Sequence, residues 1–125
     1  MKTILVVEDN PMIAAALTVR LRAAGYEVLT AADGHKAILS AVSRRPDLII
    51  SDIWMPKPIG FLNQDRLQKL GLEEVPVIYI TACKKADLPR IAREEGAVAF
   101  FEKPFDAKAL LKAVADALQQ TSFAV

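Results

Sequence analysis

The sequence predicts an α/β fold, a single (βα)5 domain built on a doubly wound parallel sheet. Short aliphatic runs, such as Ile4–Val7 and Val77–Ile80, alternate with stretches in which apolar residues recur at helical spacing. Such runs are typical of strands that are buried on both faces of a parallel sheet. Each run leads into polar residues that a core would not hold, and these residues supply the candidate site.

The first half of the chain predicts two strand–helix pairs. A strand over about Thr3–Val7 precedes a helix, because Asn10-Pro11 supplies a cap and a proline suited to the first turn, and Gly25 ends that helix. The least apolar strand, Glu27–Ala31, suits a sheet edge, and Asp33-Gly34 turns into a second helix. The helical side chains expected to face the sheet are Ile13, Leu17, Leu21, Ala24, Ala37, Ile38, Ala41 and Val42.

The second half predicts three more pairs. Proline is tolerated only in the first turn of a helix, and Pro89 lies within the apolar pattern of the fourth helix. That helix is therefore expected to start near Asp87, after a long loop at Ala82–Ala86. The other expected elements are strands at about Asp47–Ser51, Val77–Ile80 and Ala97–Phe101, and helices at about Phe61–Leu70 and Asp106–Gln119.

The predicted topology brings the polar residues together. Right-handed crossovers place helices on both faces of the sheet, and the flavodoxin-like strand order 2-1-3-4-5 has its switch point between strands one and three. Glu8-Asp9 follows the first strand and Asp52 follows the third. Since ligands bind at the carboxyl ends of such strands, we expect these three acids to form one site.

Composition limits the classes of partner and the cellular setting. The chain has 125 residues, of which 53% are hydrophobic, and its net charge is +1. No basic stripe occurs in the sequence, so we expect no direct nucleic-acid or membrane partner. A single cysteine, Cys83, excludes a disulfide framework, and neither a signal peptide nor a membrane span is indicated. These features predict a cytoplasmic protein.

The predicted cluster suits phosphoryl transfer. Three carboxylates in one crevice repel one another unless a cation intervenes, and all-oxygen ligands favour a hard ion such as Mg²⁺. Lys103 follows the fifth strand and would place a charge beside a phosphate, while Thr81 follows the fourth as a neutral donor. Asp52 stands alone on the middle strand and is the expected nucleophile, since carboxylates accept phosphoryl groups covalently.

Four segments at the strand ends share their order and spacing with a known family. They are Val7-Glu8-Asp9-Asn10, Asp52-Ile53-Trp54-Met55-Pro56 with Gly60, Ile80-Thr81-Ala82, and Glu102-Lys103-Pro104-Phe105. On these segments the chain resembles a response-regulator receiver domain along essentially its whole length. We expect one such domain over residues 1–125, with no output domain in this chain.

The resemblance implies a role for each of these residues. Asp52 would receive a phosphoryl group from a histidine kinase or a histidine phosphotransfer protein, and the domain would be a signalling switch rather than a conventional enzyme. The implied Mg²⁺ ligands are Glu8, Asp9, Asp52 and the backbone carbonyl of Trp54. The implied phosphate-binding groups are Thr81, Lys103 and the backbone amides of Trp54 and Ala82. A cis peptide bond before Pro104 and a switch aromatic at Phe100 complete the set.

The same resemblance implies an output surface. The fourth helix, fifth strand and fifth helix would bind a downstream protein or a second copy of the chain. Two other functions remain open from the residues alone. An aspartyl-nucleophile phosphatase generally needs an acid two residues after the nucleophile, where this chain has Trp54. A receiver-like module that works without phosphorylation would lack an acid or the lysine, yet both are present.

Overall fold

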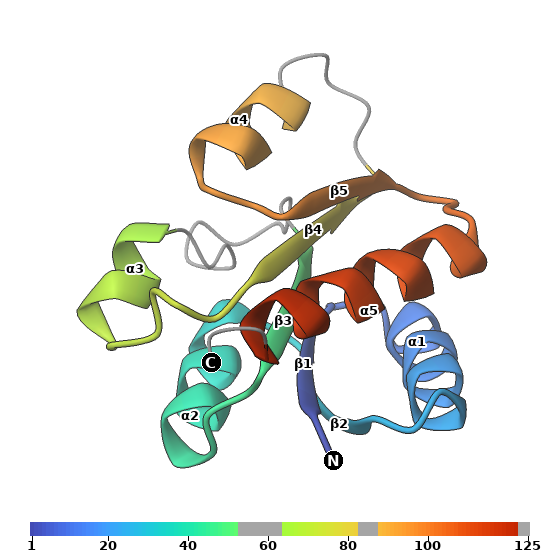
Figure 1. Ribbon diagram of the computed structural model, residues 1–125, viewed down its shortest axis with the longest axis horizontal. Coiled ribbons are helices and arrows are strands. Elements are labelled where there is room, and N and C mark those ends of the chain that lie inside the picture. The colour runs from blue at the N-terminus through green and yellow to red at the C-terminus, as the bar shows by residue number, and fades with distance from the viewer. Residues whose placement is uncertain (53–63, 83–87, 123–125) are drawn as a thin grey trace.

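Five parallel strands and five helices alternate along the described chain (Figure 1). The computed structural model describes residues 1–52, 64–82 and 88–122. The strands are β1 (Thr3–Val7), β2 (Glu27–Ala31), β3 (Leu48–Asp52), β4 (Val77–Thr81) and β5 (Ala99–Glu102). The helices are α1 (Pro11–Ala23), α2 (Gly34–Ser43), α3 (Gln64–Lys69), α4 (Leu88–Glu94) and α5 (Ala107–Ser122).

The sheet has the strand order β2-β1-β3-β4-β5, which confirms the predicted fold and topology. Its pairing aligns the carboxyl ends of the strands, because Val7 is the register partner of Ser51 and Asp52 is the partner of Ile80. All five residues of β1, β3 and β4 are buried, whereas the edge strands β2 and β5 are partly exposed. Two of these three fully buried strands, β1 and β3, lead into the acids, and β4 ends at Thr81.

Helix starts follow the capping residues that the sequence indicates. The Asn10 side chain accepts hydrogen bonds from the backbone amides of Met12 and Ile13, at 2.9 and 3.3 Å, and Pro11 is the first helical residue of α1. Asp33 caps α2 by accepting from the amide of Lys36 at 2.8 Å. These caps satisfy amides that have no partner within the helix. They fix where each helix leaves the carboxyl edge of the sheet.

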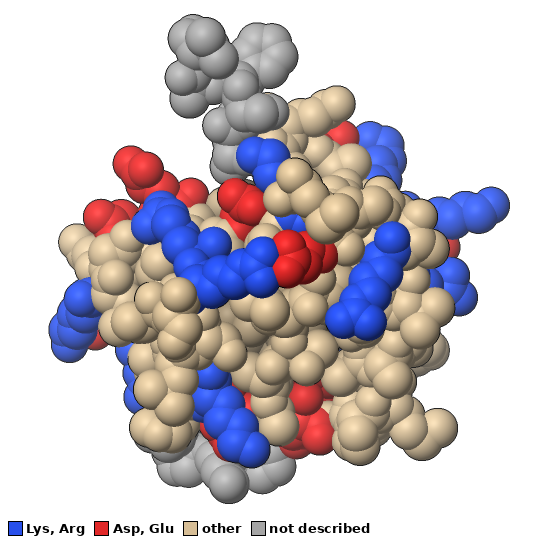
Figure 2. Space-filling model, turned by 90° about the horizontal axis from the view of Figure 1, so that it is seen from below, with Lys and Arg blue, Asp and Glu red and all other residues tan. Residues whose placement is uncertain are grey.

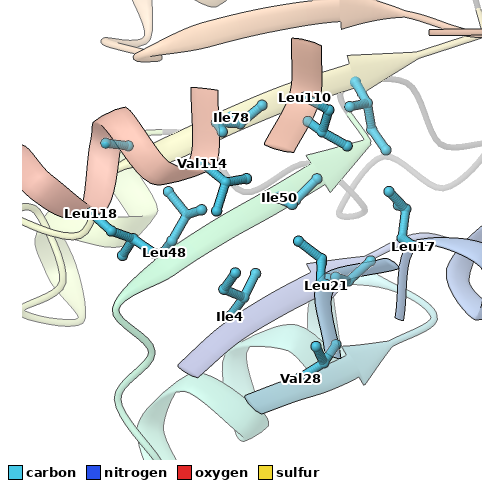
Figure 3. Close-up of a cluster of buried hydrophobic side chains, with 13 residues drawn as sticks. Ile4, Leu17, Leu21, Val28, Leu48, Ile50, Ile78, Leu110, Val114 and Leu118 are labelled. Carbon is cyan, nitrogen blue, oxygen red and sulfur yellow. The ribbon is translucent and has the colours of Figure 1, made fainter. Parts of the chain in front are cut away.

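Two apolar layers hold the helices against the sheet. One layer joins α1 and α5 to one face, and Figure 3 shows its side chains converging on Ile4, Leu48, Ile50 and Ile78 from both helices. The other layer joins α2, α3 and α4 to the opposite face through residues such as Leu5, Ile49 and Tyr79. Successive strand residues alternate between the two layers, as a pleated strand buried on both faces requires.

Several predicted boundaries and contacts differ from the structure. Ala24 and Val42 were expected in the core, but both are exposed. Ala24 is exposed because it is the C-cap of α1, where the chain turns into Gly25 at φ +98°. Val42 is exposed because it lies on α2 about 100° around the helix axis from the buried Ala41. Strand β3 extends to Asp52, and β5 begins at Ala99 rather than at Ala97.

The last two helices begin close to the residues that the sequence predicted. Helix α4 spans Leu88–Glu94, so Pro89 lies in its first turn. The expected start at Asp87 and most of the Ala82–Ala86 loop lie outside the described residues, as do the first residues of the Phe61–Leu70 helix. Asp106 precedes α5 and accepts a hydrogen bond from the amide of Lys108 at 2.9 Å. It therefore lies before the helix rather than within it.

The surface charge is mixed on the face shown in Figure 2. Lys and Arg side chains lie there in separate groups, and acidic side chains lie beside some of them. Within the described ranges, no helix combines the length and the apolar composition that crossing a membrane requires.

Replacing Leu21 by Ala should destabilise the protein by about 2–5 kcal/mol, because its fully buried side chain fills the layer between α1 and the sheet. Leu39→Ala is the matched control, since Leu39 is 57% exposed on α2 and its loss should change stability by less than about 0.5 kcal/mol. Urea unfolding followed by circular dichroism measures both. Equal destabilisation by the two substitutions would contradict this assignment of the core.

Burial raises the pKa of the Tyr79 hydroxyl above its ordinary value of 10.0, and the negative charge of Glu95 adds to the effect. Above pH 10 the unfolded chain therefore releases this proton while the folded state keeps it. Proton release favours the unfolded chain, so the free energy of unfolding falls as the pH rises above 10. Tyr79→Phe should remove part of that loss, up to about 1.4 kcal/mol per pH unit. Urea titrations between about pH 9 and 11 test this, with Tyr26→Phe as the control. A decline that Tyr79→Phe leaves unaltered would refute it.

Candidate functional site

Two neighbouring strands deliver the acids of the site. Glu8 directly follows β1 and is 2% exposed, and Asp52 is the last residue of β3 and is 3% exposed. Asp9 is the next residue along from Glu8 and is exposed. Carboxylate oxygens of the three residues lie within 4.8 Å of one another. The structure thus brings together the three acids that the sequence predicted to converge.

A lysine from the far side of the sheet completes the cluster. Lys103 follows β5, and its Nζ lies 2.9 Å from Asp52 Oδ2 and also contacts Glu8 Oε1. Its backbone amide donates to the carbonyl of Thr81 at 2.7 Å, which attaches this segment to the end of β4. The peptide bond between Lys103 and Pro104 is cis. The lysine side chain is 10% exposed, so its charge is largely removed from water.

The Glu8 carboxylate is held in one orientation. Its Oε2 accepts a hydrogen bond from the backbone amide of Asn10 at 3.0 Å. Its Oε1 is fully buried without a hydrogen bond of good geometry, and the Lys103 ammonium that contacts it supplies the opposite charge. The turn into α1 therefore aims one oxygen of Glu8 into the cluster.

Burial and pairing act in opposite directions on the charges of this cluster. Burial raises the pKa of Glu8, and the contacts with Lys103 and the amide of Asn10 only partly offset it, while the charge of Asp52 adds to the rise. Burial alone would lower the pKa of Lys103, but its contacts with Glu8 and Asp52 outweigh that effect and raise it. The ammonium is therefore charged at neutral pH, and the pocket holds a fixed positive charge beside its acids.

The donor set fits a hard divalent cation. The three residues offer only carboxylate oxygens, and among the described residues the buried Oε1 of Glu8 has no partner besides the Lys103 ammonium. Mg²⁺ prefers such ligands and keeps several of its waters. Asp9 is exposed, so water can reach this side of the cluster. Glu8, Asp9 and Asp52 are the described residues that would hold it. Trp54, the fourth expected ligand, lies outside the described residues.

The other expected residues lie on β4 and β5. Thr81 is completely buried at the end of β4, and the following Ala82 is exposed. Phe100 is half-buried beside Tyr79 in the sheet register and packs in the layer that contains Ile91 and Ala92 of α4. Thr81 and Lys103 therefore lie at the same edge of the sheet as the acids, whereas Phe100 lies within β5 and packs in the layer that α4 covers. Figure 1 shows α4 over β5.

The contact between Glu8 and Lys103 is the part of the site that sequence reasoning missed. Both residues were identified, but as a metal ligand and a phosphate ligand rather than as each other's partners. No local spacing links two residues that lie 95 positions apart (103 − 8). The polar character of both strand ends is the only sequence signal for their proximity.

Comparison with known proteins identifies the family. Residues 4–115 match the response regulator receiver domain. The chain belongs to this family. Receiver domains act in two-component signalling, and they generally bind Mg²⁺ at an acidic pocket. The acidic pocket of this receiver domain is the Glu8, Asp9 and Asp52 cluster.

Curated relatives of this receiver domain are longer proteins. The sequence is 34% identical over 122 residues to the DNA-binding dual master transcriptional regulator RpaA of Synechocystis, covering 97% of this chain and 51% of that protein. It is 34% identical over 115 residues to the transcriptional regulatory protein PdtaR of Mycobacterium tuberculosis, covering 90% of this chain and 55% of that protein. The chain thus spans about half the length of these relatives.

Solved structures of single receiver domains superpose along nearly the whole chain. Chemotaxis protein CheY4 of Vibrio cholerae gives a TM-score of 0.83 at 31% identity, covering 94% of this chain and 98% of that one. A receiver domain protein of Clostridium thermocellum gives 0.83 at 27% identity, with both chains fully covered. The fold therefore agrees with that of the family.

Proposed function

We propose that this chain is a Mg²⁺-dependent phosphoacceptor switch of a two-component phosphorelay in the cytoplasm, with Asp52 as the acceptor. The observation that carries the proposal is the position of the Asp52 carboxylate. It is buried at the end of the central strand, with Glu8 and Asp9 close by and the Lys103 ammonium 2.9 Å from its Oδ2. A carboxylate in this setting has both the acids that bind a cation and the charge that binds a phosphate.

The proposed reaction transfers a phosphoryl group from a phosphohistidine to Asp52. An oxygen of the carboxylate forms the new bond to phosphorus, and the bond between phosphorus and the histidine nitrogen breaks, leaving the electron pair on the imidazole. The donor is a histidine kinase or a histidine phosphotransfer protein. A bound Mg²⁺ would neutralise charge on the phosphoryl oxygens. Lys103 would make a charge-assisted contact with another of these oxygens, with the Thr81 hydroxyl as a neutral donor.

Phosphorylation would reach a partner through the α4–β5–α5 face. Lys103 and Phe100 belong to the same short segment of β5 and its continuation, and the Lys103 amide is bonded to the Thr81 carbonyl. Phe100 packs in the layer under α4. A shift of Thr81 and Lys103 toward a phosphoryl group would therefore alter the packing beneath α4. We expect a downstream protein or a second copy of the chain to bind there, without direct contact with nucleic acid or membrane.

Asp52→Ala should abolish covalent labelling, because it removes the only carboxylate proposed to form the bond to phosphorus. The wild-type protein, incubated with a small acyl phosphate and Mg²⁺, should gain the mass of one phosphoryl group in intact-protein mass spectrometry. Asp116→Ala is the matched control, since Asp116 is exposed on α5 and should not alter the labelling. Persistent labelling of Asp52→Ala would refute the assignment.

Lys103→Met should keep the fold but weaken the coupling of phosphorylation to Thr81 and Phe100. The substitution preserves the length of the side chain and removes a charge-assisted contact with the phosphoryl group, worth roughly 1.5–3 kcal/mol. Amide chemical shifts of Thr81 and Phe100, recorded before and after phosphorylation, measure the coupling. Lys112→Met, on the exposed surface of α5, serves as the control. The proposed role fails if both variants respond as the wild type does.

A further inference from the structure

The outer side of β2 is an open edge of the sheet. β2 is the first strand in the order β2-β1-β3-β4-β5, so within the described sheet only its inner side is paired. The Glu27 amide donates to the carbonyl of Lys2, which precedes β1. Backbone groups of successive strand residues point to alternate sides, so the amides and carbonyls of Val28 and Thr30 point outward.

The sequence of β2 contains little that would prevent another strand from pairing with it. The strand has neither proline nor lysine, and its one charged side chain, Glu27, is paired with Arg44. β2 is the lowest strand in Figure 1, so Figure 2, the view from below, faces this edge. Most of the surface between the charged groups in that view belongs to uncharged residues.

A groove of about 500 Å³ runs beside this edge, between β2 and α1. The strand contributes Val28 and Thr30, and the helix contributes mostly small or apolar side chains, including that of Val19, which is 68% exposed. The two ends of the groove have opposite charges. Asp9 lies at the carboxyl end of the strands, whereas Arg22 lies in the last turn of α1, near the amino end of β2.

We propose that two copies of the chain associate through this groove, with β2 of one copy antiparallel to β2 of the other. A two-fold axis at Leu29 would place Val28 of one copy opposite Thr30 of the other, so that their outward amides and carbonyls bond to each other. The two sheets would then form one continuous sheet. This interface lies at the opposite edge of the sheet from β5, and it requires neither a metal nor phosphorylation.

The charges of the groove favour a second copy as the occupant, in this orientation. An antiparallel arrangement brings the Asp9 end of each groove to the Arg22 end of the other. Opposite charges then attract at both ends of the interface, whereas a parallel arrangement would bring like charges together. Leu29, which is only partly buried in the single chain, would be covered by its own counterpart at the axis.

Cross-linking tests the register of the two strands. In a Cys83→Ser background, Leu29→Cys should form a disulfide between copies on oxidation with copper phenanthroline. Directly opposed residues have Cα atoms about 4.5–5.5 Å apart, which a disulfide can span. Thr30→Cys is the matched control, because its counterpart would lie diagonally across at about 7–8 Å, and its cross-linking should be lost. No cross-link at Leu29→Cys, or equal cross-linking by both variants, overturns the proposal.

Sedimentation equilibrium measures the association of the unmodified chain. The wild type should form dimers whose Kd rises with salt, since the charged ends of the groove attract each other. Val19→Glu should raise the Kd at least about tenfold, because it places a charge in the apolar part of the groove. Val98→Glu is the matched control, since Val98 is 48% exposed just before β5, at the other edge of the sheet, and its Kd should not change. A monomeric wild type, a dimer that Val19→Glu leaves intact, or equal weakening by Val98→Glu each overturns the proposal.

Discussion

The pairing of buried carboxylates with a single ammonium is the constraint on which the site depends. Glu8 and Asp52 are almost fully removed from water, and two such charges side by side are costly without a cation between them. Lys103 supplies that cation from the opposite half of the sheet. The cluster therefore joins the ends of β1, β3 and β5, and the order of the strands is what allows one lysine to reach both acids.

The rest of the molecule holds these strand ends in place. The two apolar layers bury every residue of β1, β3 and β4, so the strands have little freedom to slide. A register slip of one residue would move each apolar side chain to the wrong layer. The caps at Asn10 and Asp33 turn the chain away from the sheet immediately beyond β1 and β2. The acids therefore lie together at one edge of the sheet because the buried strands β1 and β3 end there.

The sequence predicted the parts of this arrangement that depend on local pattern. The five strands, the caps of α1 and α2 and the convergence of Glu8, Asp9 and Asp52 follow from apolar periodicity and strand order. Val42 was misplaced because a helical repeat does not show how wide the buried stripe is. Helix α2 buries Gly34, Ala37 and Ala41, with Ile38 partly buried beside them. The Glu8–Lys103 contact depends on tertiary packing between the two ends of the chain, which no spacing reveals.

The same geometry relates the chemistry at the edge to the surface beneath α4. Lys103 lies three positions beyond Phe100, directly after β5 ends at Glu102, and the hydrogen bond from its amide to the Thr81 carbonyl connects this segment to β4. Phe100 faces the α4 layer, whereas its neighbour Phe101 faces the layer of α5 and packs against Phe105, with ring centroids 6.3 Å apart. A displacement of the lysine, as proposed on phosphorylation, would therefore act on both helical layers through adjacent side chains of one strand. Because β5 is an edge strand and only partly buried, it meets less resistance to such a shift than the central strands do.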